Sequence, residues 1–359
     1  TPEHLAFVVT DTAAADRPIG VLTGDFLFVG DVGRPDLLER AARHAGTMEA
    51  GARTLFRSLR RFAEALPDYV QVWPGHGAGS ACGKALGSLP SSTVGYEKLF
   101  NRAFGFARED DFVRDVLAGQ PEPPLYFAEM KRVNRDGPRL LGGMPAPPRL
   151  PAARLDALLA EGAAVVDTRP AADFARRHVP GTLSVPLGKS FPTWAGSVLG
   201  YDRPLYLIAA AECVGEAVRD LARVGLDRVD GWLGPEAVDA WTAAHGPAAS
   251  VPEVTPGELE TLRLTGAVEV IDVRNASEHE AGHLPGALNL PLGRLAERLD
   301  AVPRHRPLVV HCQGGSRAWV AAALLKARGF ADVRHLAGDY AAWAGEGRPV
   351  EVGTGAVAV

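Results

Sequence analysis

The chain has 359 residues, a formal net charge of -5 and an apolar fraction of 47%. This length predicts two or three domains, and this composition allows a sizeable core in each. The mildly acidic balance and the absence of long basic or apolar runs argue against a nucleic-acid partner, a membrane-surface role and a spanning helix. The first residues lack a basic region and a cleavage site, so we expect no signal peptide. Three widely spaced cysteines, Cys82, Cys213 and Cys312, predict reduced thiols in a cytoplasmic protein.

The first 130 residues predict two strands, a long helix and a further strand. The apolar runs LAFVVTD (5–11) and IGVLTGDFLFVGDVG (19–33) are joined by a polar turn, and helical periodicity covers 37–67. YVQVWPGHGAGS is expected to be a strand that runs into a glycine-rich loop carrying His76. Pro and Gly are concentrated between 121 and 151, which places the end of a first domain, 1–148, in that stretch.

An internal repeat fills the rest of the chain. VVDTRPAADFARRHVPGTLSVPL (165–187) and VIDVRNASEHEAGHLPGALNLPL (270–292) match at a constant offset, and each continues into an apolar strand, a loop and a helix. Strands that alternate with helices predict a parallel α/β sheet in each copy. A period of about a hundred residues is too long for stacked repeats, so the copies are predicted to be two domains. We call them the first copy (149–249) and the second copy (250–359).

The second copy carries a candidate nucleophile, Cys312, between an apolar strand and a helix. Backbone N–H groups at a helix N-terminus favour an anion, so we expect a lowered pKa for the Cys312 thiol. Arg317 adds a cation at the end of this loop. A buried structural cysteine is the competing interpretation. The residues between Cys312 and Arg317 are expected to surround the bound substrate: Gln313, Gly314, Gly315 and Ser316.

The loop spacing, Cys-x4-Arg, is one residue shorter than the Cys-x5-Arg loop of cysteine-dependent phosphatases. The smaller ring suits one transferred sulfur atom better than a phosphoryl group, although phosphate or arsenate chemistry remains an alternative. Residues 252–350 resemble the rhodanese family. The resemblance implies a persulfide on Cys312, accepted from a sulfane donor such as thiosulfate or glutathione persulfide and passed to a thiol or cyanide. Asp272 and His283 are interpreted as structural. Arg274 is expected to pair with Glu278, and neutralising a substrate anion is its alternative role.

The first copy lacks the nucleophile. When Pro204 is aligned with Pro307, Ala209 stands in the place of Cys312, and no arginine follows promptly. Cys213 lies several residues too late to replace it. We therefore predict a catalytically silent rhodanese-like domain that serves docking or shapes a domain interface.

The N-terminal domain resembles the second half of a metallo-β-lactamase fold, through residues 23–28, 30–37 and 73–77. The match is closer to persulfide dioxygenases and glyoxalase II-like enzymes. The resemblance implies that Asp25 is a metal ligand and that His76 lies nearby, as a ligand only in a dinuclear site. It also implies that Arg34 holds the carboxylates of glutathione. The expected fold is therefore a partial metallo-β-lactamase αββα sandwich followed by two rhodanese-like parallel-sheet α/β domains.

This resemblance has one departure, because the family's His-x-His-x-Asp-His motif does not occur in the sequence. We therefore expect that the first half of the fold is missing from these 359 residues, and that they bind no catalytic metal alone. His4 and Cys82 are interpreted as packed or solvated side chains rather than ligands. An open half-sandwich exposes apolar strands, so the 1–148 region is expected to be unstable or to aggregate.

Together these features resemble the bacterial fusions of a persulfide dioxygenase with rhodanese domains. The resemblance implies ferrous iron in the complete protein, oxidation of a glutathione persulfide to sulfite, and formation of thiosulfate. A zinc-dependent thioester hydrolase like glyoxalase II and a non-enzymatic sulfur-carrier or docking module are the alternatives. The expected partners are small sulfane donors and thiols. The sequence leaves open the physiological thiol, the metal and the oligomeric state, including a homo-oligomer.

Overall fold

The computed structural model describes residues 4–41, 44–78, 80, 82–84, 86–120 and 122–353. It divides into two compact units, 1–123 and 124–359. Most of the Pro- and Gly-rich stretch, 124–151, including helix α5 (Tyr126–Asp136), therefore belongs to the same unit as the two copies. None of the described helices is long and apolar enough to cross a membrane.

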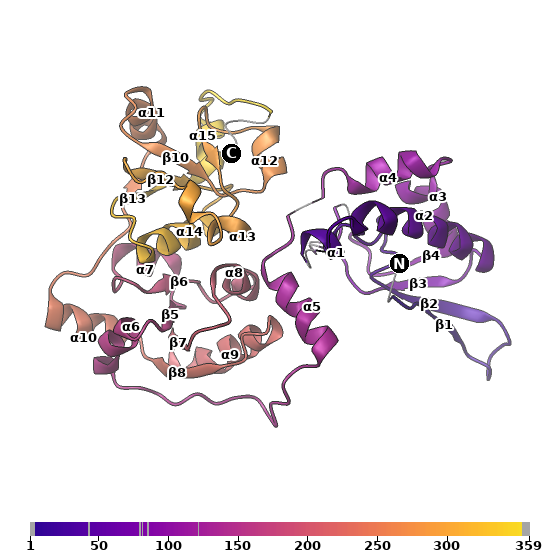
Figure 1. Ribbon diagram of the computed structural model, residues 1–359, viewed down its shortest axis with the longest axis horizontal. Helices are drawn as coiled ribbons and strands as arrows, with labels where there is room; N and C mark the ends of the chain where they lie inside the picture. Colours follow the sequence, from indigo (N-terminus) through magenta and orange to yellow (C-terminus); the bar gives the residue numbers. More distant parts are fainter. Residues whose placement is uncertain are drawn as a thin grey trace. The chain divides into compact units, whose positions relative to one another are not determined.

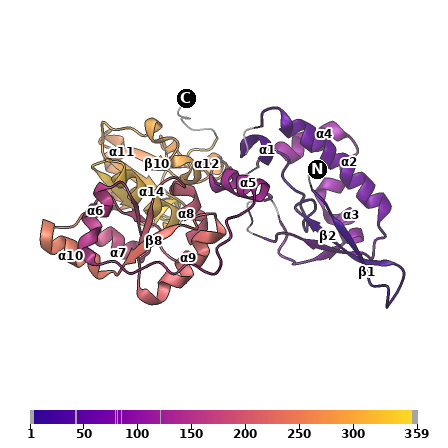
Figure 2. The same ribbon diagram turned by 60° about the horizontal axis from the view of Figure 1, so that its bottom comes forward.

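The first unit is a four-stranded sheet with helices on one face (Figures 1 and 2). Its order is β1-β2-β3-β4, with β2 and β3 parallel and the outer pairs antiparallel. Apolar side chains of α2 and α4 pack with Val21 and Val72 of the sheet. The bounds are β1 (Phe7–Thr10), β2 (Pro18–Gly24), α1 (Leu37–Arg40), α2 (Thr47–Ala65), β3 (Gln71–Pro74), β4 (Ser92–Thr93), α3 (Val94–Phe100), η1 (Arg102–Phe104) and α4 (Glu109–Leu117).

The predicted pair of N-terminal strands is confirmed, but two predicted bounds are wrong. The strand expected over 19–33 ends at Gly24, whose φ of 50° lies in the left-handed region. The helix expected over 37–67 is not continuous, because Gly46 has a φ of 79° and the long helix begins only at Thr47. Phe7 and Leu22 face each other across β1 and β2 and are 59% and 48% exposed. The sheet thus presents apolar side chains to solvent, while the expected instability of this region stays a prediction.

The second unit contains two parallel sheets that repeat one topology. The first copy has the order β6-β5-β7-β8, and the second has β11-β10-β12-β13-β9. This confirms the parallel α/β sheets predicted from the repeat. The first copy comprises η2 (Ala152–Arg154), α6 (Leu155–Ala160), β5 (Ala164–Asp167), α7 (Ala171–Arg176), β6 (Leu183–Ser184), α8 (Phe191–Val198), β7 (Leu205–Ile208), η3 (Ala211–Cys213), α9 (Val214–Arg223), β8 (Val229–Leu233) and α10 (Glu236–His245).

The second copy is built around a central strand, β12, that consists only of buried residues. Its sequence, LVVH, is the continuous apolar type expected for a strand covered on both faces. The elements are β9 (Glu253–Val254), α11 (Pro256–Leu264), β10 (Glu269–Asp272), α12 (Ala276–Ala281), β11 (Leu288–Asn289), α13 (Leu292–Leu295), η4 (Leu299–Ala301), β12 (Leu308–His311), α14 (Ser316–Ala327), β13 (Val333–Leu336) and α15 (Asp339–Gly345).

Helix α14 joins the two copies through a shared core. It contacts its own strands β12 and β13 on one side, and α7, α8 and β6 of the first copy on the other (Figure 1). Seven of its residues, Ala318 and Val320–Leu325, are buried, and a helix that is apolar on all sides requires cover on all sides. One hydrophobic cluster accordingly runs from Val166 and Leu207 in the first copy to Val310 and Leu324 in the second.

Candidate active site

Cys312 lies directly after the central strand β12 and four residues before α14 begins at Ser316. Its side chain is 1% exposed. The backbone N–H of Gly315 donates to Cys312 Sγ over 3.1 Å, which turns the loop back on the sulfur. Gly315 has a φ of 98°, a conformation that glycine adopts without steric cost. One backbone donor of this loop thus points at the sulfur.

Arg317 occupies the first turn of α14 and is held by a carboxylate from a neighbouring helix. Its Nη1 and Nη2 donate to the two oxygens of Glu278 over 2.6 and 2.7 Å. The side chain is 15% exposed. A bidentate pair of this kind fixes the guanidinium plane as well as its charge. Arg317 is thus held in a fixed orientation by Glu278, and its positive charge lowers the pKa of the Cys312 thiol against the larger effect of burial.

The buried carboxylate of Asp339 holds the Cys312 loop through a hydrogen bond to its backbone. Its Oδ1 accepts the backbone N–H of Cys312 over 2.6 Å, and its Oδ2 lies 3.0 Å from His335 Nε2. The other ring nitrogen of His335 lies 3.1 Å from Glu253 Oε1, while Trp319 stacks on the imidazole at 3.8 Å. Asp339 is the only described non-glycine residue with a positive φ, 58°. Strain of this kind persists where the surrounding contacts over-determine the conformation.

The pKa of the Cys312 thiol is raised above its ordinary value, whereas a lowered pKa was expected. Burial raises the pKa of the thiol, and the negative charge of Asp339 raises it further. The N–H groups of Ala318 and Gly314 and the charge of Arg317 act in the opposite direction but do not outweigh burial. The prediction of a lowered pKa was wrong because it considered only the local helix N-terminus and omitted the burial of the thiol and a carboxylate from α15.

The Asp-x-Arg element of the repeat forms a buried fork at the end of β10. Arg274 donates to both oxygens of Asp272, to the carbonyl of Gly282 over 2.7 Å and to Gln313 Oε1 over 3.3 Å. The expected pairing of Arg274 with Glu278 is wrong, since Glu278 binds Arg317 instead. Burial would raise the pKa of Asp272, but hydrogen bonding from His279 and the nearby charges lower it overall.

The same fork recurs in the first copy, where Arg169 donates to Asp167 and to the carbonyl of Arg177. The two repeat histidines also match, because His283 and His178 each place Nδ1 beside the carbonyl four residues earlier. A fork retained in a copy without the nucleophile supports the structural interpretation of Asp272 and His283.

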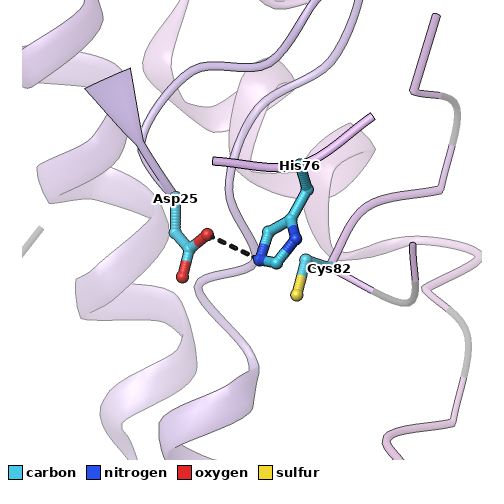
Figure 3. Close-up of side chains that lie close together, drawn as sticks. All are labelled: Asp25, His76 and Cys82. Carbon is cyan, nitrogen blue, oxygen red and sulfur yellow. Dashed lines mark ion pairs between the residues drawn. The ribbon is translucent and has the colours of Figure 1, made fainter. Parts of the chain in front are cut away.

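The first unit gathers a second cluster of possible ligands, Asp25, His76 and Cys82, at the ends of two strands. Asp25 follows β2 and His76 follows β3, and these strands are parallel neighbours with Gly24 beside Pro74. His76 Nε2 lies 3.1 Å from Asp25 Oδ1. Cys82 completes a group whose ligand atoms all lie within 4.8 Å of one another. Figure 3 shows the three side chains gathered, with the imidazole beside both the carboxylate and the thiol.

Sequence reasoning missed Cys82 here because it compared this cysteine only with the other cysteines. The available signal was its position six residues after His76 in one glycine-rich loop. Oxygen-activating non-haem iron typically uses two imidazoles and one carboxylate. The described cluster offers one imidazole, one carboxylate and a thiol, so it does not fit that centre, and we derive no step through iron.

The two other residues considered for this region have protein partners. His4 Nε2 accepts the backbone N–H of Asp25 over 3.0 Å, so this histidine braces the loop rather than joining the cluster. Arg34 is buried and donates to both oxygens of Asp36 over 3.0 and 2.6 Å. Contact between Arg34 and glutathione stays a prediction.

The second copy is similar in sequence to known proteins. Residues 255–346 match the family model of the rhodanese-like domain. A sulfurtransferase of Allochromatium vinosum is 34% identical over 91 residues, which are 25% of this chain and 85% of that protein. The human thiosulfate:glutathione sulfurtransferase is 34% identical over 109 residues, 26% of this chain and 95% of that protein. The chain belongs to the rhodanese family. The second copy is its rhodanese domain, and Cys312 lies within the matched residues.

A solved structure extends the similarity beyond this rhodanese domain. A metallo-beta-lactamase from Staphylococcus aureus is 38% identical, with a TM-score of 0.56, over 66% of this chain and 64% of that chain. The chain therefore spans just under two thirds of that structure. The match covers more residues than the first unit alone contains. A rhodanese domain and a metallo-β-lactamase-like domain are thus joined in one chain.

The sheet register confirms that the first copy lacks a cysteine at the rhodanese position. Asp272 of β10 lies opposite His311 of β12, and Asp167 of β5 lies opposite Ile208 of β7. The next residue along is Cys312 in one copy and Ala209 in the other. Cys213 lies four residues further, at the end of the short helix η3. The two copies thus share the scaffold but not the sulfur nucleophile.

Proposed function

We propose that this protein is a sulfurtransferase that carries sulfane sulfur as a persulfide on Cys312. The observation that carries the proposal is the placement of a buried cysteine sulfur in the loop that opens α14, where the Gly315 N–H donates to it. The 34% identity to two proteins named as sulfurtransferases supports the same chemistry. Thiosulfate and glutathione persulfide are the proposed donors.

The proposed transfer needs no external oxidant. The Cys312 thiolate attacks the sulfane sulfur of thiosulfate, the sulfur–sulfur bond of the donor breaks, and sulfite leaves with the electron pair. The product is a Cys312 persulfide anion. An acceptor thiolate then attacks the outer sulfur, which forms the acceptor persulfide and returns the Cys312 thiolate. Arg317 and the N–H groups of the loop stabilise the negative charge on sulfur in both steps.

Intact-protein mass spectrometry tests this proposal. After incubation with thiosulfate, the native chain is expected to gain one sulfur atom that cyanide removes, and Cys312→Ser is expected to gain none. Cys213→Ser is the matched control, because this half-buried cysteine belongs to the silent copy, and it should gain sulfur like the native chain. Equal sulfur addition to Cys312→Ser would reject the proposal. A stable persulfide that no small thiol discharges would favour a sulfur-carrier or docking module instead.

We propose, as the finer assignment, that the first unit belongs to a persulfide dioxygenase-like domain, which is active only where further metal ligands join the residues of the described cluster. Its support is the metallo-beta-lactamase neighbour at 38% identity together with the covalent link to a rhodanese domain. Tethering raises the local concentration of a shared intermediate. Sulfite formation from glutathione persulfide in the presence of ferrous iron and oxygen would support it. Two bound zinc ions with thioester hydrolysis would favour the glyoxalase II-like alternative.

A further inference from the structure

Three side chains of the second copy form a continuous line of polar contacts that ends at the Cys312 backbone: Glu253, His335 and Asp339. His335 Nδ1 lies 3.1 Å from Glu253 Oε1, and His335 Nε2 lies 3.0 Å from Asp339 Oδ2. Asp339 Oδ1 then accepts the backbone N–H of Cys312 over 2.6 Å. The Glu253 side chain is 54% exposed, so the line runs from a carboxylate in solvent to the buried nucleophile. The proposed sulfur transfer assigns no task to Glu253 or His335.

The sheet and the start of α15 place these residues together. Strands β9 and β13 are parallel neighbours with Glu253 opposite His335, and Asp339 follows four residues later as the first residue of α15. The backbone N–H of Tyr340 donates to the carbonyl of Cys312 over 3.1 Å. Hydrogen bonds in both directions therefore join the start of α15 to the nucleophile.

The His335 ring is held on its face as well as at its edge. Trp319 of α14 stacks on it with ring centroids 3.8 Å apart, and the His335 side chain is 3% exposed. Among the described contacts of the ring, the charged partners are Glu253 on β9 and Asp339 on α15, while α14 contributes the uncharged Trp319. A Cβ at Gly315 would lie 3.3 Å from Asp339 Oδ2, so the residue whose N–H donates to the sulfur packs directly against this group.

We propose that His335 is a positioning residue for sulfur transfer, which acts on Cys312 through the Asp339 carboxylate. A carboxylate only accepts hydrogen bonds, so each contact of the ring is a hydrogen bond when the facing ring nitrogen carries a proton. The bond from Nε2 fixes the orientation of Asp339 and draws negative charge toward Oδ2, away from the oxygen that faces Cys312. This role deepens the proposed sulfur transfer and rests on it, but the effect on the thiolate exists without a sulfur donor.

The direction of the effect follows from the groups around the sulfur. Burial raises the pKa of the Cys312 thiol, and the charge of Asp339 raises it further. Without the His335 N–H, more of the Asp339 charge acts on Cys312, so the pKa of the thiol should rise again. Without the Asp339 charge, the pKa should fall, and removal of His335 should then add nothing. Simple packing support would not produce opposite shifts of which one depends on the other.

Alkylation of Cys312 by iodoacetamide, followed against pH by peptide mass spectrometry on the full chain, tests the proposal. His335→Leu should shift the profile to higher pH by about one unit, whereas Asp339→Asn should shift it to lower pH. The double variant should show the profile of Asp339→Asn alone. His335→Gln, whose amide nitrogen can still donate to Asp339, should lie close to the native profile. His305→Leu is the matched control, because this histidine also faces a carboxylate but is 66% exposed and precedes β12.

Three outcomes of this experiment would overturn the proposal. The first is a native profile in His335→Leu, and the second is a shift to lower pH in that variant. The third is an equal shift by His335→Leu in the native and the Asp339→Asn background, because His335 would then act independently of Asp339.

Sulfur uptake from thiosulfate distinguishes failure of this proposal from failure of the proposed function. His335→Leu should gain sulfur on Cys312 about tenfold more slowly than the native chain at neutral pH, because the thiolate fraction falls about tenfold for each unit of pKa. His335→Gln should recover most of the rate. A native chain that gains no sulfur would reject the sulfur transfer, and the alkylation profiles would still decide whether His335 acts on Cys312.

A measurement on the native chain protects the test against misfolding of His335→Leu, in which the buried Asp339 loses a partner. Nuclear magnetic resonance of isotopically labelled histidine reports on the His335 ring, whose signals are identified by their loss in His335→Gln. These signals should change as the Cys312 thiol titrates, and Cys312→Ser should lack this step. Identical His335 signals at every pH in the native chain and in Cys312→Ser would also overturn the proposal.

Discussion

At the scale of single residues, the unusual feature of the rhodanese loop is Asp339. Its carboxylate accepts the Cys312 N–H while its charge opposes formation of the Cys312 thiolate. The residue therefore fixes the position of the nucleophile and at the same time makes the free thiol less acidic. Arg317 is the opposing cation, and its fork with Glu278 limits how much of its charge is directed at the sulfur. The balance between these two residues controls the pH range in which the thiolate is present.

The substitution Asp339→Asn separates the hydrogen bond with the Cys312 N–H from the effect of the negative charge. The amide oxygen can still accept the Cys312 N–H, but the negative charge is removed, so the pKa of the Cys312 thiol should fall. The rate of Cys312 alkylation by iodoacetamide, followed against pH, should shift to lower pH than in the native chain. Asp332→Asn is the control, since that carboxylate pairs with Arg334 away from the loop. An unchanged alkylation profile, or a shift to higher pH, would show that the charge of Asp339 does not act on Cys312.

At the scale of elements, the Asp-x-Arg fork ties the end of a strand to the loop after the next helix. In the second copy, Arg274 connects β10 to the carbonyl of Gly282 and lies 4.0 Å from the ring centre of Tyr340 on α15. Both partners of the pair are buried, with side chains 2% and 0% exposed. Removing one partner of such a pair leaves an uncompensated buried charge, which costs far more than the pair itself contributes.

Arg274→Met is therefore expected to lower the free energy of unfolding by about 3–5 kcal/mol. Adding Asp272→Asn to this variant removes the orphaned charge and should recover part of the loss. Arg169→Met in the silent copy is the matched comparison, and it should cost less because Arg169 is 14% exposed. Urea unfolding followed by tryptophan fluorescence measures all three. A loss below about 1 kcal/mol for Arg274→Met would mean that the fork is not a structural tie.

At the scale of elements, the sequence predicted those features that depend on residues close together in the chain. The apolar run of β12 and the cysteine after it were both readable from the sequence. The alignment of Pro204 with Pro307 likewise predicted that Ala209 takes the place of Cys312. What the sequence did not reveal depends on distant contacts. Asp339 is 27 residues from Cys312, and the choice of Arg317 rather than Arg274 as partner of Glu278 is a result of tertiary packing.

At the scale of the whole molecule, the packing of α14 gives the first copy, the silent copy that lacks the cysteine, a structural role. The first copy has no cysteine at the position of Cys312. Its helices α7 and α8 nevertheless contact the helix whose N-terminus surrounds Cys312. The buried residues of both copies form one cluster, in which Val320 and Leu324 of α14 take part. The helix that follows the Cys312 loop is thus packed against a domain that lacks the corresponding cysteine.

A truncated chain tests this role. Residues 250–359 alone would expose the face of α14 that the silent copy covers, and exposed apolar surface of this kind promotes association. We expect this fragment to aggregate and to gain sulfur from thiosulfate much more slowly than the full chain. Residues 124–359 are the matched control, because that cut follows the boundary between the two units and leaves both copies together. If size-exclusion chromatography and mass spectrometry found 250–359 monodisperse and as readily persulfidated as 124–359, the silent copy would be dispensable for the rhodanese fold. Its retention would then have to be explained by binding to another molecule.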